Sequence, residues 1–130
     1  MDCLIVGDSI AKGVADVRKD CTAYVQSGIT SRDWYRKFYN KPIGGRTVVI
    51  SLGTNDTAHI NTREELLVIR SMFDYADRVL WLLPPIKPHV QAAVFTVADA
   101  YGDDVLQINN LSSDGVHPTS KGYKEIAKQF

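Results

Sequence analysis

The chain has 130 residues, of which 45% are hydrophobic, and its 15 Lys and Arg residues balance its 15 Asp and Glu residues. This length and composition are typical of one globular domain with its own hydrophobic core. A zero net charge argues against a nucleic-acid-binding surface, which normally requires an excess of basic residues. The longest apolar stretch, residues 79–85, is too short to span a bilayer. We therefore expect a single domain over residues 1–130, with neither a membrane span nor nucleic acid as a partner, and the oligomeric state stays open.

The first apolar run begins almost at Met1, without the charged and long apolar segments of a secretory signal. A cytoplasmic location is the resulting expectation, with release by cell lysis or a trimmed N-terminus as alternatives. Cys3 lies within this run, and a buried, inert thiol is its favoured interpretation. A disulfide with Cys21 is the less favoured alternative, because two cysteines do not make a disulfide framework. Neither cysteine belongs to a spacing that is typical of a metal site.

Five short apolar runs alternate with longer amphipathic stretches. The runs have the length of strands, and most are continuously apolar, as in strands that are covered on both faces. They are Cys3–Val6, Thr22–Val25, Thr47–Leu52, Val79–Leu83 and Val105–Ile108. Helices are predicted at Ser31–Phe38, from Thr62 with an apolar face that reaches Ala76, at Val90–Tyr101 and at Ser120–Phe130. Thr62 and Glu65 have the spacing of a capping box, in which the two residues satisfy each other's backbone donors.

This alternation predicts an α/β fold: a three-layer α/β/α sandwich around a five-stranded parallel sheet. We expect the flavodoxin-like strand order 2-1-3-4-5. Ligands of such sheets bind beyond the carboxyl ends of the strands, so the residues that follow each strand are the candidates for a functional site.

Polar residues follow the predicted strands at this edge. Ser9 follows the first strand, Asn55 the third, and Asp114 and His117 the fifth. A serine at a strand-to-helix turn can expose its hydroxyl, an Asp on a tight turn can reach a His imidazole, and an amide can donate to an oxyanion. Each has a purely structural alternative: Ser9 as a helix N-cap, Asn55 as an Asx turn, and Asp114 as a turn cap beside a surface His117. Their convergence at one edge favours acyl transfer.

Four blocks of the sequence carry a family resemblance. They are Gly7-Asp8-Ser9-Ile10, Gly28 within Gln-Ser-Gly-Ile-Thr, Gly53-Thr54-Asn55-Asp56, and Asp114-Gly115-Val116-His117-Pro118 leading into the last helix. In order and strand context the blocks resemble those of the SGNH hydrolases, also called GDSL esterases or lipases, over nearly the whole chain. Ile10 replaces the usual leucine of the first block, and the lone Gly28 is the least specific match.

The resemblance implies a role for each matching residue. Ser9 would be the nucleophile, His117 the general base and then the acid, and Asp114 the group that holds His117. The oxyanion hole would come from the Ser9 and Gly28 N–H groups and the Asn55 side-chain amide. Asp8 would support the loop. The resemblance implies no metal and no cofactor.

The connections between the blocks are short, notably between Asn40 and Val48, which suggests a shallow, open site. We therefore expect a serine esterase that acts on short acyl groups such as acetyl, on a small molecule or a carbohydrate. A thioesterase or lysophospholipase is one alternative, and a non-catalytic binding module on the same fold is another. A nucleotide or receiver domain would leave Asp114 and His117 unexplained. His89 and Lys87 are expected on surface loops, while Trp34 and Tyr35 could pack in the core or stack on a sugar.

Overall fold

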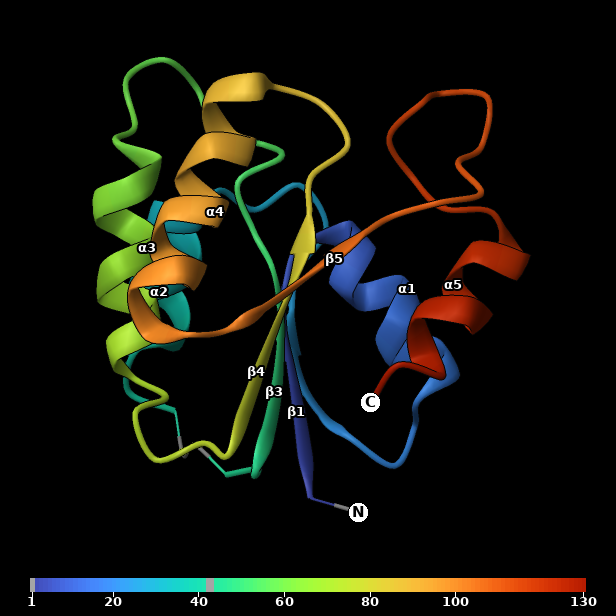
Figure 1. Cartoon of the computed structure of the whole chain (residues 1–130), viewed down its shortest axis with the longest axis horizontal. Coiled ribbons are helices and arrows are strands. Elements are labelled where there is room, and N and C mark those ends of the chain that lie inside the picture. The colour runs from blue at the N-terminus through green and yellow to red at the C-terminus, as the bar shows by residue number, and fades with distance from the viewer. Residues whose placement is uncertain (1, 42–43) are drawn as a thin grey trace.

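The computed structural model describes residues 2–41 and 44–130 and has a five-stranded parallel sheet at its centre (Figure 1). The strands are β1 (Cys3–Gly7), β2 (Thr22–Val25), β3 (Thr47–Ser51), β4 (Arg78–Leu83) and β5 (Asp104–Gln107). Their order is β2-β1-β3-β4-β5, and all neighbouring pairs are parallel. The predicted fold class and strand order are therefore confirmed.

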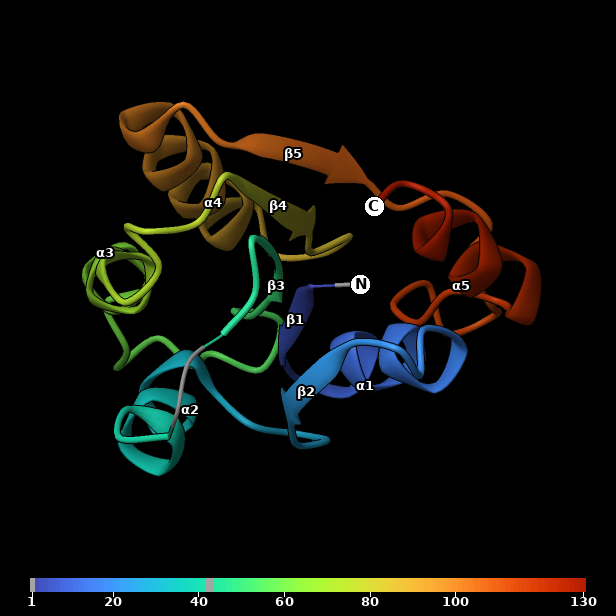
Figure 2. The same cartoon turned by 90° about the horizontal axis from the view of Figure 1, so that it is seen from below.

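Helices cover both faces of the sheet, as the view from below shows (Figure 2). They are α1 (Ser9–Val17), α2 (Ser31–Phe38), α3 (Thr62–Ser71), α4 (Pro88–Tyr101) and α5 (Ser120–Ala127). Helices α1 and α5 lie on one face, and α2, α3 and α4 lie on the other. These layers form the expected α/β/α sandwich.

The continuous apolar runs of the strands follow from this layering. Leu4 and Val6 face the α2–α4 layer, whereas Ile5 between them faces the α1–α5 layer, and all three are fully buried. In β3, Val48 and Val49 divide between the two layers in the same way. Because successive side chains of a strand point to opposite faces, a strand that is covered on both sides exposes neither face to solvent and is mostly apolar.

Helix α3 begins at Thr62 as predicted, but it ends at Ser71, before Ala76, and its cap differs from the prediction. One end each of α4 and α5 also differs. Helix α3 is capped by Asn61, whose side chain accepts a hydrogen bond from the Glu64 N–H. The capping box is therefore wrong: the Thr62 hydroxyl instead donates to the carboxylate of Asp56 at 2.8 Å. Helix α4 begins at Pro88, two residues earlier than predicted, because the fixed φ of proline suits the first turn of a helix. Helix α5 ends at Ala127.

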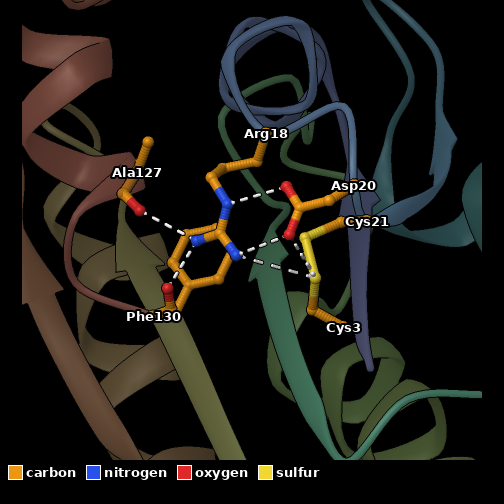
Figure 3. The surroundings of a disulfide bond; sticks show 6 residues. All are labelled: Cys3, Arg18, Asp20, Cys21, Ala127 and Phe130. Carbon is orange, nitrogen blue, oxygen red and sulfur yellow. Dashed lines mark hydrogen bonds and ion pairs between the residues drawn. A yellow bond between two sulfur atoms is a disulfide. The ribbon is translucent and has the colours of Figure 1, made fainter. Parts of the chain in front are cut away.

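The favoured interpretation of the cysteines is also wrong, because Cys3 and Cys21 form a disulfide (Figure 3). The bond joins the start of β1 to the residue before β2, so it encloses the whole β1–α1 unit. Beside it, the Arg18 guanidinium pairs with Asp20 and donates to the carbonyl oxygens of Ala127 and Phe130. The disulfide region is thereby connected to the end of the chain.

Within the described residues, no helix is long and apolar enough to cross a membrane. In the connection between Asn40 and Val48, residues 42–43 lie outside the described residues.

Candidate active site

Ser9 is the first residue of α1, just beyond the carboxyl end of β1. The turn before it requires glycine at position 7, where φ is +142° and a Cβ would lie only 1.9 Å from the Ser51 carbonyl oxygen. That oxygen accepts the Asp8 N–H at 3.0 Å, so the turn is held against the end of β3. Asp8, and not Ser9, is the N-cap of α1, since its carboxylate accepts the Ile10 N–H at 3.1 Å. The Ser9 hydroxyl is therefore not used in helix capping.

Asp114 and His117 lie on a closed loop between β5 and α5. The Ser112 N–H donates to the His117 carbonyl at 2.8 Å, and Leu111 and Pro118 form an antiparallel bridge. Inside this loop, one oxygen of Asp114 accepts the Val116 N–H, the His117 N–H and the Ser112 hydroxyl at 2.8, 2.9 and 2.8 Å. The other oxygen is left to face the imidazole.

The structure brings Ser9, His117 and Asp114 into one hydrogen-bonded chain. Ser9 Oγ lies 2.7 Å from His117 Nε2, and His117 Nδ1 lies 2.8 Å from Asp114 Oδ2. The hydrogen bond from His117, followed by those of the loop, holds the pKa of Asp114 well below its usual range. An ionised Asp114 fixes the proton of the neutral imidazole on Nδ1, which leaves Nε2 free to accept the Ser9 proton. This arrangement can activate a hydroxyl nucleophile.

The three candidate oxyanion donors lie on neighbouring loops at the same edge. In the described part of the chain, no acceptor is found for the backbone N–H groups of Ser9 and Gly28. Gly28 is exposed, with φ at +77°. The half-buried Asn55 donates from Nδ2 to the Ile29 carbonyl at 3.2 Å, next to Gly28 in the chain. The structure thus brings Asn55 and the Gly28 segment together, and the Asn55 amide has its second N–H left for another acceptor.

The site is open to solvent. The side chains of His117 and Asp114 are 42% and 50% exposed, and Ser9 is half-buried. The exposure of the His117–Asp114 pair gives a bulky substrate access to the candidate nucleophile. It also means that part of the reacting ester would stay in contact with water.

Asp8 is a fully buried carboxyl beside the candidate nucleophile. Its Oδ1 accepts the Ser51 hydroxyl at 3.1 Å in addition to the Ile10 N–H. Its Oδ2 is buried and has no hydrogen-bond partner among the described residues. Burial raises the pKa of Asp8 to about 6, although the hydrogen bonds from Ser51 and Ile10 oppose the shift. Asp8 therefore supports the Ser9 loop, as the resemblance implied, at an electrostatic cost.

Other residues singled out in the sequence take no part in the hydrogen bonds that link Ser9, His117 and Asp114. Trp34 is a core residue, 1% exposed, while Tyr35 is half-buried against the same core. His89 is exposed at the start of α4 and lines an open surface pocket with residues of α3 and α4. The expectation for Lys87 is wrong: its half-buried side chain donates to the Asp56 carbonyl at 2.9 Å.

One group of described residues has side chains close enough to bind a metal: Cys3, Asp20 and Cys21. The two sulfurs are joined in the disulfide, so they cannot act as thiolate ligands. Asp20 is already paired with Arg18.

Comparisons with known proteins find similar structures but no family model or curated protein with a similar sequence. No protein-family model and no curated protein matches the sequence. Among solved structures, a member of the lipolytic protein G-D-S-L family from Veillonella parvula DSM 2008 superposes with a TM-score of 0.70. It is 15% identical, and the match covers 97% of this chain and 93% of that one. The chain has the SGNH-hydrolase fold.

Two further structures share the SGNH-hydrolase fold with this chain. The C-terminal catalytic domain of peptidoglycan O-acetyltransferase A from Streptococcus pneumoniae has a TM-score of 0.67 at 16% identity, over 97% of this chain and 88% of that one. A Bacteroides fragilis NCTC 9343 protein, provisionally named an acylhydrolase, has a TM-score of 0.65 at 21% identity, over 97% and 82%. The neighbours with this fold are thus named for acyl hydrolysis or acyl transfer.

Proposed function

We propose that this protein is a serine hydrolase of the SGNH type that cleaves esters of short carboxylic acids through an acyl-enzyme on Ser9. The observation that carries the proposal is the hydrogen-bonded chain from Ser9 Oγ through His117 to Asp114, with separations of 2.7 and 2.8 Å. A buried N-cap or an ordinary turn would not require these three side chains to meet across 108 residues of sequence.

In the proposed reaction, Ser9 Oγ attacks the ester carbonyl carbon while His117 Nε2 takes the hydroxyl proton. The carbonyl oxygen becomes an oxyanion, which the Ser9 and Gly28 N–H groups and the Asn55 amide stabilise. The carbon–oxygen bond to the alcohol then breaks, and the imidazolium of His117 gives its proton to the leaving alkoxide. Water repeats these steps on the acyl-enzyme and releases the carboxylic acid, with Asp114 holding the imidazole throughout.

The exposure of the His117–Asp114 pair supports a substrate in which a short acyl group is esterified to a bulky alcohol. With His117 and Asp114 42% and 50% exposed, the site offers little enclosed apolar surface to a long acyl chain. We propose an acetyl ester, carried by a carbohydrate or a small molecule, as the substrate class. The peptidoglycan O-acetyltransferase among the structural neighbours is named for transfer of the same acyl group to a sugar polymer.

Hydrolysis of p-nitrophenyl acetate, butyrate and octanoate tests the proposal. Wild type is expected to cleave acetate fastest, and Ser9→Ala to lose all turnover above background. Ser71→Ala is the matched control, because Ser71 is exposed at the end of α3 and remote from the chain of hydrogen bonds. Full activity in Ser9→Ala would reject the assignment of Ser9 as the nucleophile. A strong preference for octanoate would reject the short-acyl specificity and favour the thioesterase or lysophospholipase alternative.

A further inference from the structure

Asp56 is a buried carboxylate at the carboxyl edge of the sheet, next to Asn55 in the chain. It is 1% exposed. Its oxygens accept the Ser31 N–H at 2.8 Å, the Ser31 hydroxyl at 2.6 Å and the Thr62 hydroxyl at 2.8 Å. Ser31 and Thr62 are the first residues of α2 and α3, so one carboxylate holds the starts of two helices. The positive ends of both helix dipoles lie near it, which offsets the cost of burying its charge.

These contacts reach two of the segments that form the candidate oxyanion hole, the one that begins at Gly28 and the turn that carries Asn55. Ser31 is three residues beyond Gly28, and the intervening Ile29 accepts the Asn55 amide at 3.2 Å. The segment from Gly28 to Ser31 is therefore fixed by Asn55 near one end and by Asp56 at the other. The Asp56 N–H donates to the Gly53 carbonyl at 3.0 Å and closes the turn that carries Asn55.

A third loop is attached to the same residue. The Lys87 ammonium donates to the Asp56 carbonyl at 2.9 Å, and Lys87 is one of two non-glycine residues with positive φ among the described residues. A left-handed backbone at a lysine is costly and persists only where other contacts hold it. The loop between β4 and α4 is thus fixed against Asp56 as well.

We propose that Asp56 is a positioning residue of the oxyanion hole: it holds the Gly28 N–H and the Asn55 amide in the arrangement that receives the oxyanion. The proposal rests on the function proposed above. Donors stabilise a developing charge only when they are held in place before the reaction. Loosening the Gly28 segment or the Asn55 turn should therefore slow the chemical step more than it weakens binding of the ground-state ester.

A second buried carboxylate provides the matched control. Asp103 has a side chain that is 4% exposed, and it accepts hydrogen bonds from Arg70 and from the Trp81 indole. It directly precedes β5, at the amino end of that strand, whereas Ser9 follows the carboxyl end of β1. Asp103→Asn thus removes a comparable buried charge without touching the oxyanion loops.

The first test compares steady-state hydrolysis of p-nitrophenyl acetate by Asp56→Asn, Asp103→Asn, Ser9→Ala and wild type. Asp56→Asn is expected to lower kcat by about 10- to 100-fold with KM within about twofold of wild type. Asp103→Asn is expected to keep kcat within about twofold. If Asp56→Asn does not fold, Thr62→Val takes its place, because it removes one donor to Asp56 at nearly constant volume, and a smaller fall in kcat is expected. Equal kcat losses in the Asp56 and Asp103 variants would overturn the proposal.

The second test is a double-mutant cycle with Asn55→Ala. If Asp56 acts through the oxyanion donors, Asp56→Asn should cost clearly less in kcat when Asn55 is already absent. Fully multiplicative losses would mean a merely structural role. The Ser9→Ala variant distinguishes failure of the proposed function from failure of the positioning role. Activity in Ser9→Ala would reject the proposed function itself. An inactive Ser9→Ala together with a fully active Asp56→Asn would reject only the positioning role of Asp56.

Discussion

Asp8 and Asp114 are carboxyl groups on either side of the candidate nucleophile, and their surroundings shift their pKa values in opposite directions. Asp114 is exposed and accepts four hydrogen bonds, chiefly that of His117, which keep its pKa below the usual range. Asp8 is buried with one oxygen unpaired among the described residues, and its pKa rises to about 6. The charge that the proposed reaction requires is thus on the solvated carboxylate of Asp114, while the buried Asp8 shapes the loop before Ser9.

The Asp8 shift predicts a pH dependence of stability. Its pKa is about 6 in the folded chain against 3.8 for an unperturbed Asp, so between these values the folded state holds a proton that the unfolded state has lost. The stabilising contribution is complete below about pH 3.8 and is lost as the pH rises through 6. We expect wild type to lose stability relative to Asp8→Asn between pH 4 and pH 7, by up to about 3 kcal/mol. Urea unfolding of both proteins across this range measures the difference, and parallel stability curves would contradict it.

At the scale of elements, the packing of α1 against α5 brings the candidate nucleophile and base together. Ser9 begins α1, and His117 lies just before α5. One turn after Ser9, the half-buried Tyr123 ring of α5 lies against the backbone at Gly13. A Cβ at position 13 would lie 2.3 Å from two ring carbons of Tyr123. The small residue therefore sets how closely the two helices approach.

Gly13→Ala is predicted to reduce activity through this contact. The methyl group should displace Tyr123 and α5, and with them the His117 loop, because interiors tolerate added volume poorly. We expect kcat to fall by about tenfold or more, since small misplacements of catalytic groups are costly. Gly44→Ala is the control, because a Cβ at position 44 meets nothing within 4 Å. A kcat equal to that of the control would show that the helix spacing does not govern the site.

Strands and helices that leave a pattern in their own stretch of sequence were predictable, whereas contacts between residues far apart in the sequence were not. The strands were predicted to within one residue at each end, because a strand covered on both faces leaves a continuous apolar run. Asp56 escaped prediction because its partner Ser31 is 25 residues away and nothing in the local sequence marks the pair. The capping box failed for the same reason: the Thr62 hydroxyl is bound to Asp56 and is not left for its own helix.

At the scale of the whole molecule, the disulfide joins the starts of β1 and β2 at the amino end of the sheet. It encloses β1 and α1, and the adjoining Asp20 holds Arg18 against the carbonyl of Ala127 at the end of α5. Disulfides persist mainly in oxidising surroundings. The cytoplasmic location expected from the sequence stays a prediction.

The disulfide predicts a measurable redox dependence of stability. Cross-links that close a loop of this size, with a sequence separation of 18, typically stabilise a protein by about 3 kcal/mol. We expect reduction, or the Cys3→Ala/Cys21→Ala double variant, to lower the thermal midpoint by roughly 10 °C, because a domain of this length loses about 4 °C per kcal/mol. Thiol titration of the unreduced, denatured protein should find no free thiol. Two free thiols and an unchanged midpoint would exclude the bond.

The central claim, that Ser9 is a nucleophile activated by His117, is tested most directly by mass spectrometry after treatment with a serine-reactive fluorophosphonate. The account predicts a single covalent adduct on the peptide that contains Ser9, none in Ser9→Ala, and much slower labelling in His117→Ala, because the imidazole no longer takes the hydroxyl proton. An adduct on another residue, or labelling of Ser9 at the same rate without His117, would contradict it.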